Sequence, residues 1–349
     1  MLTKKQIKEI REHLEKAQNP LFFFDNDPDG LCSFILLRRY LGRGKGVPIR
    51  SFPGLSVDYF RKIDELKADY IFILDKPVVS KEFFDAVKQI NIPVVWIDHH
   101  DINKKEIPKF VNYYNPIFNR GKKIEPVTYL CYKIAERKED LWFAIAGCVS
   151  DHFIPDFYPE FLKTYLDLGF KTDEPFGILY NSQIGKISRI FSFALKDSLT
   201  NVVRMLRYLI EVKSPYEVLD VNPKNRFMHE KFNQIDRTYQ KLVKKAKENS
   251  DGQILFFQYS SDLSISSDVS NQLSYLFPDK FVVVMRVLDS KVSVSARGKN
   301  IRGKVLKAIK DLKDATGGGH EDAVGAKVRT EDLEEFKERL RHVVEDRKI

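Results

Sequence analysis

Carboxylate and imidazole side chains gather at four places along the sequence, each beside the expected end of a buried segment. These residues are Asp25, Asp27 and Asp29 in one loop, Asp75, the run Asp98-His99-His100, and Asp151. Carboxylates packed together repel one another and cost stability unless a positive group neutralises them. Oxygen ligands with one or two imidazoles suit Mn²⁺ or Mg²⁺ better than a thiolate-seeking metal. The pattern therefore predicts a site for two divalent ions, which together can activate a water and stabilise a leaving oxygen.

Each of these features also has a purely structural explanation when it is taken alone. An Asp-rich loop before a helix commonly forms a turn and caps the helix. The run Asp98-His99-His100 could form a surface turn, and Asp151 could cap a helix or pair with a lysine. The metal site is favoured because all four features occur together, each at a boundary between expected elements.

The first third of the chain alternates between expected strands and helices. Apolar runs predict strands at 20–24, 48–52, 70–74 and 92–97, and helical spacing predicts helices at 1–17, 31–41, 57–66 and 80–90. Such alternation indicates an α/β fold with a doubly wound parallel sheet, whose ligand sites lie at the carboxyl ends of the strands. Asp25, Asp75 and Asp98 stand at such ends.

The rest of the chain predicts a helical region and then a second, smaller α/β domain. Helical spacing continues over 126–210, and a long, strongly charged helix is expected over 222–249. A solvated surface explains the charges of that helix better than a dedicated nucleic-acid arm. Further strands are expected at 254–258, 281–287, 292–295 and 324–329, helices at 269–276 and 301–312, a turn at Thr316–His320, and a closing charged helix.

Composition narrows the class of protein and the kind of partner. With 349 residues, of which 43% are hydrophobic and 31% charged, the chain is expected to fold as two globular domains. A formal charge of +9 favours a polyanionic partner. Basic segments at 43–50, 120–123 and 297–307 would suit a single-stranded backbone, although few aromatic residues accompany them.

Cysteine use and the hydrophobic runs indicate where the protein works. Three widely spaced cysteines, none in a Cys-x-x-Cys motif, suggest neither a disulfide framework nor a zinc site, so a reducing cytoplasm is expected. The N-terminal segment is amphipathic and charged rather than a signal peptide, and no apolar run reaches membrane-spanning length. No membrane partner is expected.

These motifs resemble those of the DHH phosphoesterase superfamily, and the second domain resembles its DHHA1 companion. The loop Asp25-Asn-Asp-Pro-Asp-Gly30, Asp75, Asp98-His99-His100 and Asp151 are similar to the first four family motifs. Ser295-Ala-Arg297-Gly298 and Gly317-Gly-Gly-His320 resemble the substrate-holding motifs of DHHA1 domains. The resemblance implies a DHH catalytic domain over residues 1–220, a linker helix over 221–250, a DHHA1 substrate-binding domain over 251–349, and an active-site cleft between the domains.

The resemblance also implies a role for each candidate residue. The metal ligands would be Asp27, Asp29, Asp75, His99 and Asp151, with Asp25 as a ligand or an orienting group. His100, grouped with Asp98 as catalytic, would lie beside the scissile phosphate and assist proton transfer or stabilise charge. The residues holding a substrate phosphate or terminal nucleotide would be Arg297, Gly318, Gly319 and His320. Lys76 departs from the family pattern, and it either offsets negative charge or reaches a substrate phosphate.

The expected activity is metal-dependent hydrolysis of short single-stranded oligonucleotides, RNA or DNA, from one end. One alternative is a nucleotide 3′-phosphatase or cyclic-dinucleotide phosphodiesterase on the same scaffold. Another is a non-catalytic DHH subunit of a replication or repair assembly, which the complete set of expected ligands argues against. A homodimer and a replication or repair partner are compatible with the sequence. Cleavage direction, the RNA or DNA preference and the physiological metal stay open.

Overall fold

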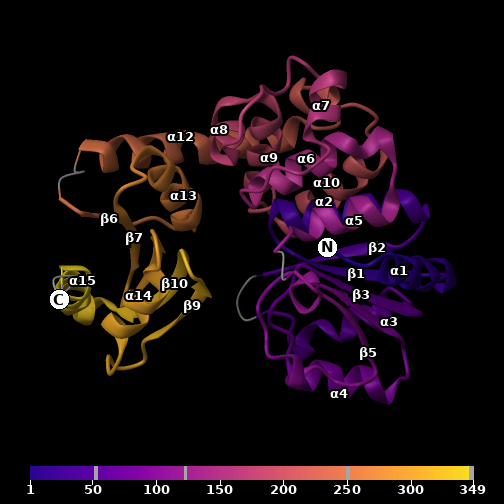
Figure 1. Ribbon diagram of the computed structural model, residues 1–349, viewed down its shortest axis with the longest axis horizontal. Helices are drawn as coiled ribbons and strands as arrows, with labels where there is room; N and C mark the ends of the chain where they lie inside the picture. The colour runs from indigo at the N-terminus through magenta and orange to yellow at the C-terminus, as the bar shows by residue number, and fades with distance from the viewer. Residues whose placement is uncertain (51–53, 122–123, 249–251, 346–349) are drawn as a thin grey trace. The chain divides into compact units, whose positions relative to one another are not determined.

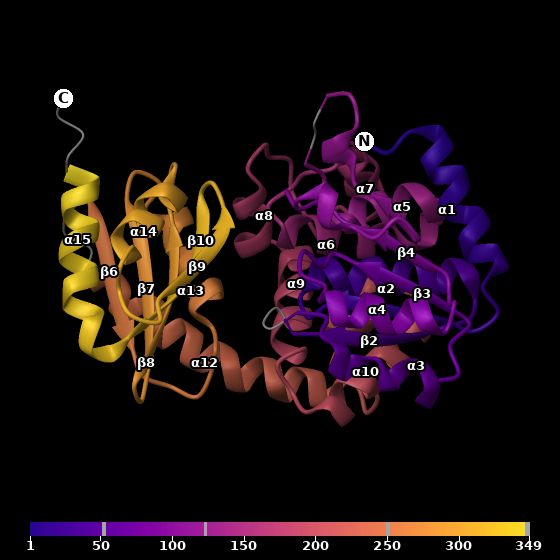
Figure 2. The same ribbon diagram turned by 90° about the horizontal axis from the view of Figure 1, so that it is seen from below.

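The computed structural model describes residues 1–50, 54–121, 124–248 and 252–345. The chain divides into two compact units, Met1–Phe232 and Asn233–Ile349, and the division falls inside helix α12 (Arg226–Glu248). Figure 2 shows α12 as one continuous helix. Three expectations lie partly outside the described residues: the strand end at 51–52, the basic residues 122–123, and the linker boundary at 250–251. The domain limits at 220 and 250 stay predictions.

The first unit is built on a five-stranded sheet with the strand order β2-β1-β3-β4-β5. Its strands are β1 (Pro20–Asp25), β2 (Lys45–Ile49), β3 (Tyr70–Leu74), β4 (Val94–Ile97) and β5 (Val111–Tyr114). Every neighbouring pair is parallel, which confirms the predicted sheet. Because the chain leaves β1 for β2 on one side and β3 lies on the other, the strand order reverses between β1 and β3. Open α/β sheets bind ligands at such a reversal.

Helices cover both faces of this sheet (Figure 1). They are α1 (Lys4–Lys16), α2 (Pro28–Leu41), α3 (Arg61–Glu65) and α4 (Lys81–Gln89). On one face Phe22 and Phe24 of β1 pack against Phe34 of α2, and on the other Phe23 packs against Phe83 of α4. Successive residues of β1 are therefore buried on opposite faces, which explains why its sequence is continuously apolar rather than alternating.

A helical region follows the sheet, as predicted for 126–210. Its helices are α5 (Val127–Ala135), α6 (Leu141–Ser150), α7 (Tyr158–Thr164), α8 (Pro175–Asn181), α9 (Gln183–Ala194), α10 (Leu199–Glu211) and α11 (Pro215–Leu219). α6 is buried along its whole length from Leu141 to Val149, because α2, α5 and α9 pack around it. Within the described ranges, no helix combines the length and the apolar character needed to cross a bilayer.

Three local predictions for the first unit are wrong. β2 begins at Lys45 rather than 48, and Gly46 lies so close to the Phe34 ring that a Cβ would be 2.6 Å from it. The helix expected over 57–66 is a short 3-10 turn followed by the five-residue α3. β5 was not predicted, because only Val111 and Tyr114 of this edge strand are buried and its apolar signal is weak.

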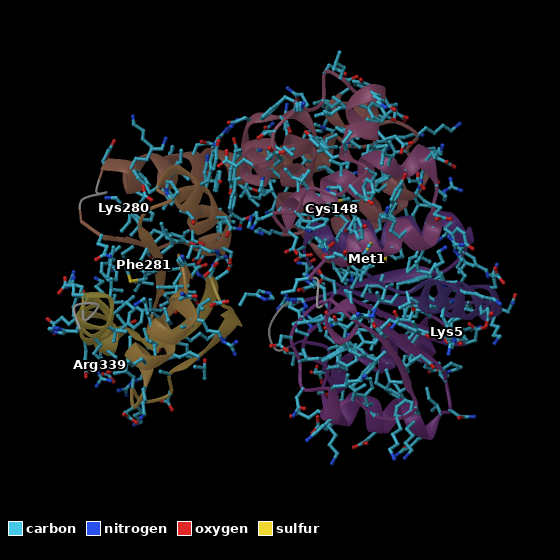
Figure 3. All side chains as sticks on the ribbon, viewed as in Figure 1. Met1, Lys5, Cys148, Lys280, Phe281 and Arg339 are labelled. Carbon is cyan, nitrogen blue, oxygen red and sulfur yellow. The ribbon has the colours of Figure 1, made fainter. Side chains whose placement is uncertain are left out.

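The second unit contains a mixed five-stranded sheet with the order β6-β7-β8-β10-β9. Its strands are β6 (Ile254–Tyr259), β7 (Phe281–Leu288), β8 (Lys291–Arg297), β9 (Thr316–His320) and β10 (Ala323–Arg329), and its helices after α12 are α13 (Ser266–Leu276), α14 (Ile301–Ile309) and α15 (Leu333–Glu345). α14 and α15 bury one sheet face in a core that includes Phe281, labelled in Figure 3. α13 packs on the other face, against β7 and β8.

The expected turn at Thr316–His320 is wrong, because this segment is the edge strand β9. All five residues pair with β10, from Thr316 opposite Lys327 to His320 opposite Ala323. Consecutive glycines resemble a turn signal, but here they allow close packing: a Cβ on Gly317 would lie 2.8 Å from the side chain of Ile309. The reversal of the chain occurs instead at the next two residues, Glu321 and Asp322.

Candidate metal centre

The seven acidic and imidazole side chains predicted as metal ligands or as the catalytic histidine come together in the first unit. Their possible ligand atoms form three groups, and within each group all atoms lie within 4.8 Å of one another. The groups are Asp25, Asp27 and Asp75; Asp75, His99 and His100; and Asp29, His99 and Asp151. Asp75 and His99 each belong to two groups, so the three groups are contiguous. The arrangement offers adjacent positions for more than one cation.

The carboxyl ends of three neighbouring strands bring these residues to one edge of the sheet. Asp25 ends β1, Asp75 follows β3, and Asp98 to His100 follow β4. Helices supply the other groups: Asp27 and Asp29 lie at the start of α2, and Asp151 lies at the end of α6. Gly30 permits this crowding, since a Cβ there would lie 2.4 Å from the backbone oxygen of Asp25.

Backbone amides orient two of the carboxylates. Asp27 caps α2, and its Oδ1 accepts a hydrogen bond from the amide of Gly30 at 2.9 Å. Asp29 accepts hydrogen bonds from the amides of Val127 (2.9 Å) and Thr128 (2.7 Å) at the start of α5. The helix-capping explanation is thus correct for Asp27, but it does not exclude a metal, because an ionised carboxylate has several lone pairs.

Asp75 is almost fully buried, and a buried carboxylate without a compensating partner destabilises the folded protein. The residue is 3% exposed and adopts a left-handed backbone conformation with φ of 56°, which is unusual for a residue other than glycine. Within the described chain its Oδ1 accepts no hydrogen bond, although His99 Nε2 lies 3.3 Å away. A buried carboxylate oxygen without a donor, held in a strained conformation, fits a position for a cation.

The electrostatics of the centre point the same way. Burial raises the pKa of Asp75 well above its usual range, and the charges of Asp29 and Asp27 raise it further. Burial also raises the pKa of Asp27 to about 8, with the charges of Asp25 and Asp29 adding to the effect. For His99, burial lowers the pKa, but the charges of Asp151 and Asp29 outweigh it and the net shift is upward. Both upward shifts of the carboxyl groups arise from burial and from neighbouring negative charge, and a bound cation would oppose both, so the donor set fits divalent metal ions.

Asp98 has a different position from the other carboxylates. It is fully buried and accepts hydrogen bonds from His100 Nδ1 at 2.7 Å and from the Tyr113 hydroxyl at 3.2 Å. Asn115 Nδ2 donates to the Tyr113 oxygen (2.8 Å) and to the backbone oxygen of His100 (2.9 Å). Because an ionised carboxylate only accepts hydrogen bonds, Nδ1 is the nitrogen through which His100 donates to Asp98, and Nε2 is not part of this network. Tyr113 and Asn115 were missed because they lie in and directly after β5, the strand that the sequence did not reveal.

Lys76 is an internal partner of the centre. Its side chain is 1% exposed, and Nζ donates to Asp25 Oδ1 at 2.9 Å and to the backbone oxygen of Arg50 at 3.1 Å. Asp25 Oδ1 also accepts from the amide of Asn26. Of the two roles considered for Lys76, this geometry supports the offset of negative charge. Contact with a substrate phosphate would require the lysine to leave a buried ion pair.

The four candidate residues of the second unit lie at one end of its sheet. Arg297 and His320 both pair in register with Ala323, so their side chains lie on the same sheet face, separated by one strand. Gly318 lies on the same face opposite Gly325, and a Cβ on either glycine would meet no atom within 4 Å. Gly319 lies next to His320 with φ of +140°, a conformation that glycine favours.

Two residues that the sequence did not single out hold this end of the sheet in place. Asn271 of α13 accepts a hydrogen bond from Arg297 Nε at 2.6 Å. Asp322 accepts from the amide of Asn300 through its side chain (2.7 Å) and from that of Gly298 through its backbone oxygen (3.1 Å). These bonds join the β9–β10 turn to the loop after Arg297. No sequence pattern signals them, because the partners lie more than 20 residues apart.

Two family models match the chain. The model described as the DHH family, N-terminal domain, matches residues 21–150, and that of the DHHA1 domain matches residues 250–346. The first match includes every candidate residue of the metal centre except Asp151, and the second includes the four candidates on β8 and β9. No sequence among curated proteins matches the chain.

Solved structures share the fold at low sequence identity. RecJ from Thermus thermophilus in complex with Mn²⁺ has a TM-score of 0.68 and 16% identity, covering 98% of this chain and 54% of RecJ, so this chain spans about half the length of that protein. An exonuclease RecJ bound to manganese has a TM-score of 0.62 and 16% identity, covering 99% and 95%. An exopolyphosphatase-related protein from Bacteroides fragilis has a TM-score of 0.56 and 13% identity, covering 98% of each chain. At these identities the likeness shows the fold alone.

Proposed function

Because this chain belongs to the DHH/DHHA1 superfamily, we propose that it is a metal-dependent phosphoesterase that hydrolyses short single-stranded oligonucleotides from one end. The observation that carries the proposal is the contiguous group of carboxylates and imidazoles around Asp75 and His99. This group is too rich in buried negative charge to be explained as a set of helix caps. A cation-dependent reaction explains it.

In this proposal the metal ligands are Asp27, Asp29, Asp75, His99 and Asp151, and Asp25 is a ligand or an orienting group. Two bound ions would supply an activated water and positive charge near the reacting phosphate. Two features support two positions: Asp75 and His99 are each shared between ligand groups, and Asp151, with a side chain 42% exposed, lies at the outer side of its group. Mn²⁺ or Mg²⁺ fits the oxygen-rich donor set.

The protein's own residues would move the proton and position the substrate. Asp98 fixes the tautomer of His100, which leaves Nε2 to donate a proton to the leaving oxygen. Arg297 and His320 would contact a substrate phosphate, and Gly318 and Gly319 would let the backbone approach it closely. Binding one end of the strand in this way favours cleavage from that end. The cleft that would unite the two sets of residues is part of the proposal.

Two classes of substrate fit the proposed chemistry, and we favour nucleic acid. The Mn²⁺-bound exonuclease RecJ with this fold and the charge of +9 support nucleic acid. The exopolyphosphatase-related protein with the same fold supports small phosphate compounds as a second candidate, and this class includes the nucleotide 3′-phosphatase and the cyclic-dinucleotide phosphodiesterase. A cytoplasmic location, a homodimer and a replication or repair partner stay proposals.

A product ladder from an end-labelled oligonucleotide tests this function. With Mn²⁺ we expect stepwise shortening from one end, faster for short single strands than for duplexes. A parallel panel would contain dinucleotides, 3′-phosphoadenosine 5′-phosphate and cyclic dinucleotides. Turnover of the small compounds alone would contradict the nuclease and leave the phosphoesterase intact. No turnover of any substrate, despite metal binding, would instead favour the non-catalytic subunit.

A further inference from the structure

The C-terminal half of α12 presents a strongly basic surface. Between 237 and 247 the helix holds five lysine or arginine residues and no acidic residue. All five are exposed, and we call them the basic face of α12: Arg237, Lys241, Lys244, Lys245 and Lys247. This charge lies outside the metal centre and outside the candidate residues of β8 and β9, so the proposed function does not yet use it.

Packing of the helix fixes the direction of this face. Ile235, Tyr239, Val243 and Ala246 are buried and follow one another at helical spacing. Because they form the opposite side of α12, rotation of the helix cannot neutralise or bury the basic side chains. The helix therefore holds a fixed array of positive charge about 15 Å long, from the rise of 1.5 Å per residue over ten residues.

Like charges follow one another along the basic face of α12, between Asp236 and Glu248. Arg237, Lys241 and Lys245 follow one another at intervals of four residues, a spacing at which like charges destabilise a helix. In the described chain no ion pair involves Arg237, Lys241 or Lys244. Helix α1 shows the contrasting arrangement, because Lys5 and Lys8 face Glu9 and Glu12 four residues later. An ordinary solvated helix face resembles α1, whereas α12 accumulates repulsion that an anionic partner would relieve.

We propose that the basic face of α12 binds the phosphate backbone of single-stranded nucleic acid. This inference rests on the proposed nuclease function and extends that function to substrates longer than a few nucleotides. No aromatic side chain is exposed on this part of α12, so contact would be electrostatic, indifferent to base sequence and dependent on salt. An anionic membrane is a poorer partner, because the apolar side of α12 is buried and cannot insert.

Two double variants with equal loss of charge test the proposal on the full chain. K241Q/K244Q removes two unpaired charges from α12, and K5Q/K8Q removes two ion-paired lysines from α1, where Lys5 is labelled in Figure 3. Glutamine forms helices nearly as well as lysine, and a surface charge pair on a helix changes stability by only about 0.5 kcal/mol, so both variants should melt within a few degrees of the wild type. Binding of a fluorescent oligothymidylate of about 20 nucleotides would be measured without divalent metal over a range of salt concentrations.

We expect K241Q/K244Q to bind the long oligonucleotide roughly fivefold more weakly than the wild type. The plot of log K against log salt concentration should also become less steep by about 1.4, because each phosphate that the variant no longer neutralises contributes about 0.7 to the slope. K5Q/K8Q should match the wild type, and both variants should turn over a dinucleotide at the wild-type rate.

Equal weakening by the two variants would overturn the proposal, because net charge alone would then explain binding. Unchanged oligonucleotide binding, or stronger binding to anionic vesicles, would overturn it too. Because binding is measured without catalysis, failure of the nuclease function would be visible separately as a lack of product.

Discussion

The two regions proposed to bind ligand are built in opposite ways. In the first unit most of the carboxylates are buried, two are held by backbone amides, and all lie so close together that their charges conflict. In the second unit β9 is exposed along its whole length and three of its five residues are glycine. His320 is exposed, and Arg297 is half-buried beside α13. Fixed, buried oxygens suit a small ion that must be held at defined distances. An open glycine strand suits a larger ligand that must enter and leave.

This difference separates two kinds of failure. Changes in the first unit should abolish metal binding and the chemical step, and should alter stability because buried charges are involved. Changes on β8, β9 and their supports should weaken substrate binding and leave the metal and the fold nearly unaffected. A single substitution that weakened both metal binding and substrate binding would show that the two regions are not independent.

The largest effect is expected from Asp75→Asn. The substitution removes the carboxylate shared by two ligand groups, and we expect kcat to fall roughly thousandfold, since a lost metal position forfeits several kcal/mol of transition-state stabilisation. Product formation at saturating substrate and Mn²⁺ would measure it. Asp173→Asn, a change at an exposed residue outside the three ligand groups, is the matched control. A variant with more than a tenth of wild-type kcat would remove Asp75 from the metal centre.

The next largest effect concerns Lys76→Met. Because Lys76 is the buried partner of Asp25, its loss leaves a carboxylate uncompensated, and we expect the free energy of unfolding to drop by about 3 to 5 kcal/mol. Urea denaturation would measure it. Adding Asp25→Asn to the variant should recover much of the loss, since no unpaired charge then remains. If the single variant unfolds at the wild-type urea concentration but binds substrate poorly, Lys76 contacts the phosphate after all.

The pH dependence of the metal-free protein should reveal the crowded carboxylates. Asp27 has its pKa raised in the folded state from 3.8 to about 8. Below pH 4 the group is protonated in both states, and between pH 4 and about 8 the unfolded chain loses the proton that the folded chain keeps, so stability falls as the pH rises. Melting temperatures across this range should fall less steeply for Asp27→Asn. Added Mn²⁺ should raise the melting temperature most at the alkaline end, since protons compete with the metal. A wild-type curve parallel to that of Asp27→Asn would contradict the charge conflict.

In the second unit, Arg297→Ala should raise KM about 10- to 100-fold for oligonucleotides, as expected for the loss of charge-assisted hydrogen bonds to a phosphate. The affinity for Mn²⁺ should stay at the wild-type value. The melting temperature should fall by a few degrees, because Arg297 also donates hydrogen bonds to Asn271, Ser295 and the backbone oxygen of Ala296. Asn271→Ala should have a smaller effect on KM in the same direction, because Asn271 only orients the guanidinium. Lost metal binding in Arg297→Ala would mean that the two regions are not independent.

The smallest effect is expected from Tyr113→Phe. It removes one hydrogen bond to Asp98, worth about 1 kcal/mol, so kcat should fall roughly fivefold while KM is unchanged. The affinity for Mn²⁺ should stay at the wild-type value, because Tyr113 and Asp98 lie outside the three ligand groups. A fall in stability with kcat unchanged would reduce Tyr113 to a packing role.

The sequence predicted the metal-centre residues better than the residues that hydrogen-bond to them. Long, continuously apolar strands such as β1 and β3 give a strong signal, so Asp25 and Asp75 could be assigned to strand ends. β5 is short and half-exposed, and with it the network of Tyr113 and Asn115 was missed.

Long-range contacts set the remaining differences. The glycines of β9 carry a turn signal that pairing with β10 overrides. The role of Lys76 depends on its ion pair with Asp25, 51 residues away, which no local pattern encodes. The superfamily resemblance supplied the candidates of the second unit, whereas Asn271 and Asp322 became visible only through their hydrogen bonds.

The most direct test of the central claim is calorimetric titration of the metal-free protein with Mn²⁺ at pH 8. A centre in which Asp75 and His99 are shared between ligand groups predicts about two ions per chain in the wild type, with tight binding at one position or more. Asp75→Asn should lose at least one of them and Arg297→Ala should lose none. A wild-type protein that binds no Mn²⁺, or an Asp75→Asn variant that binds as the wild type does, would contradict the claim.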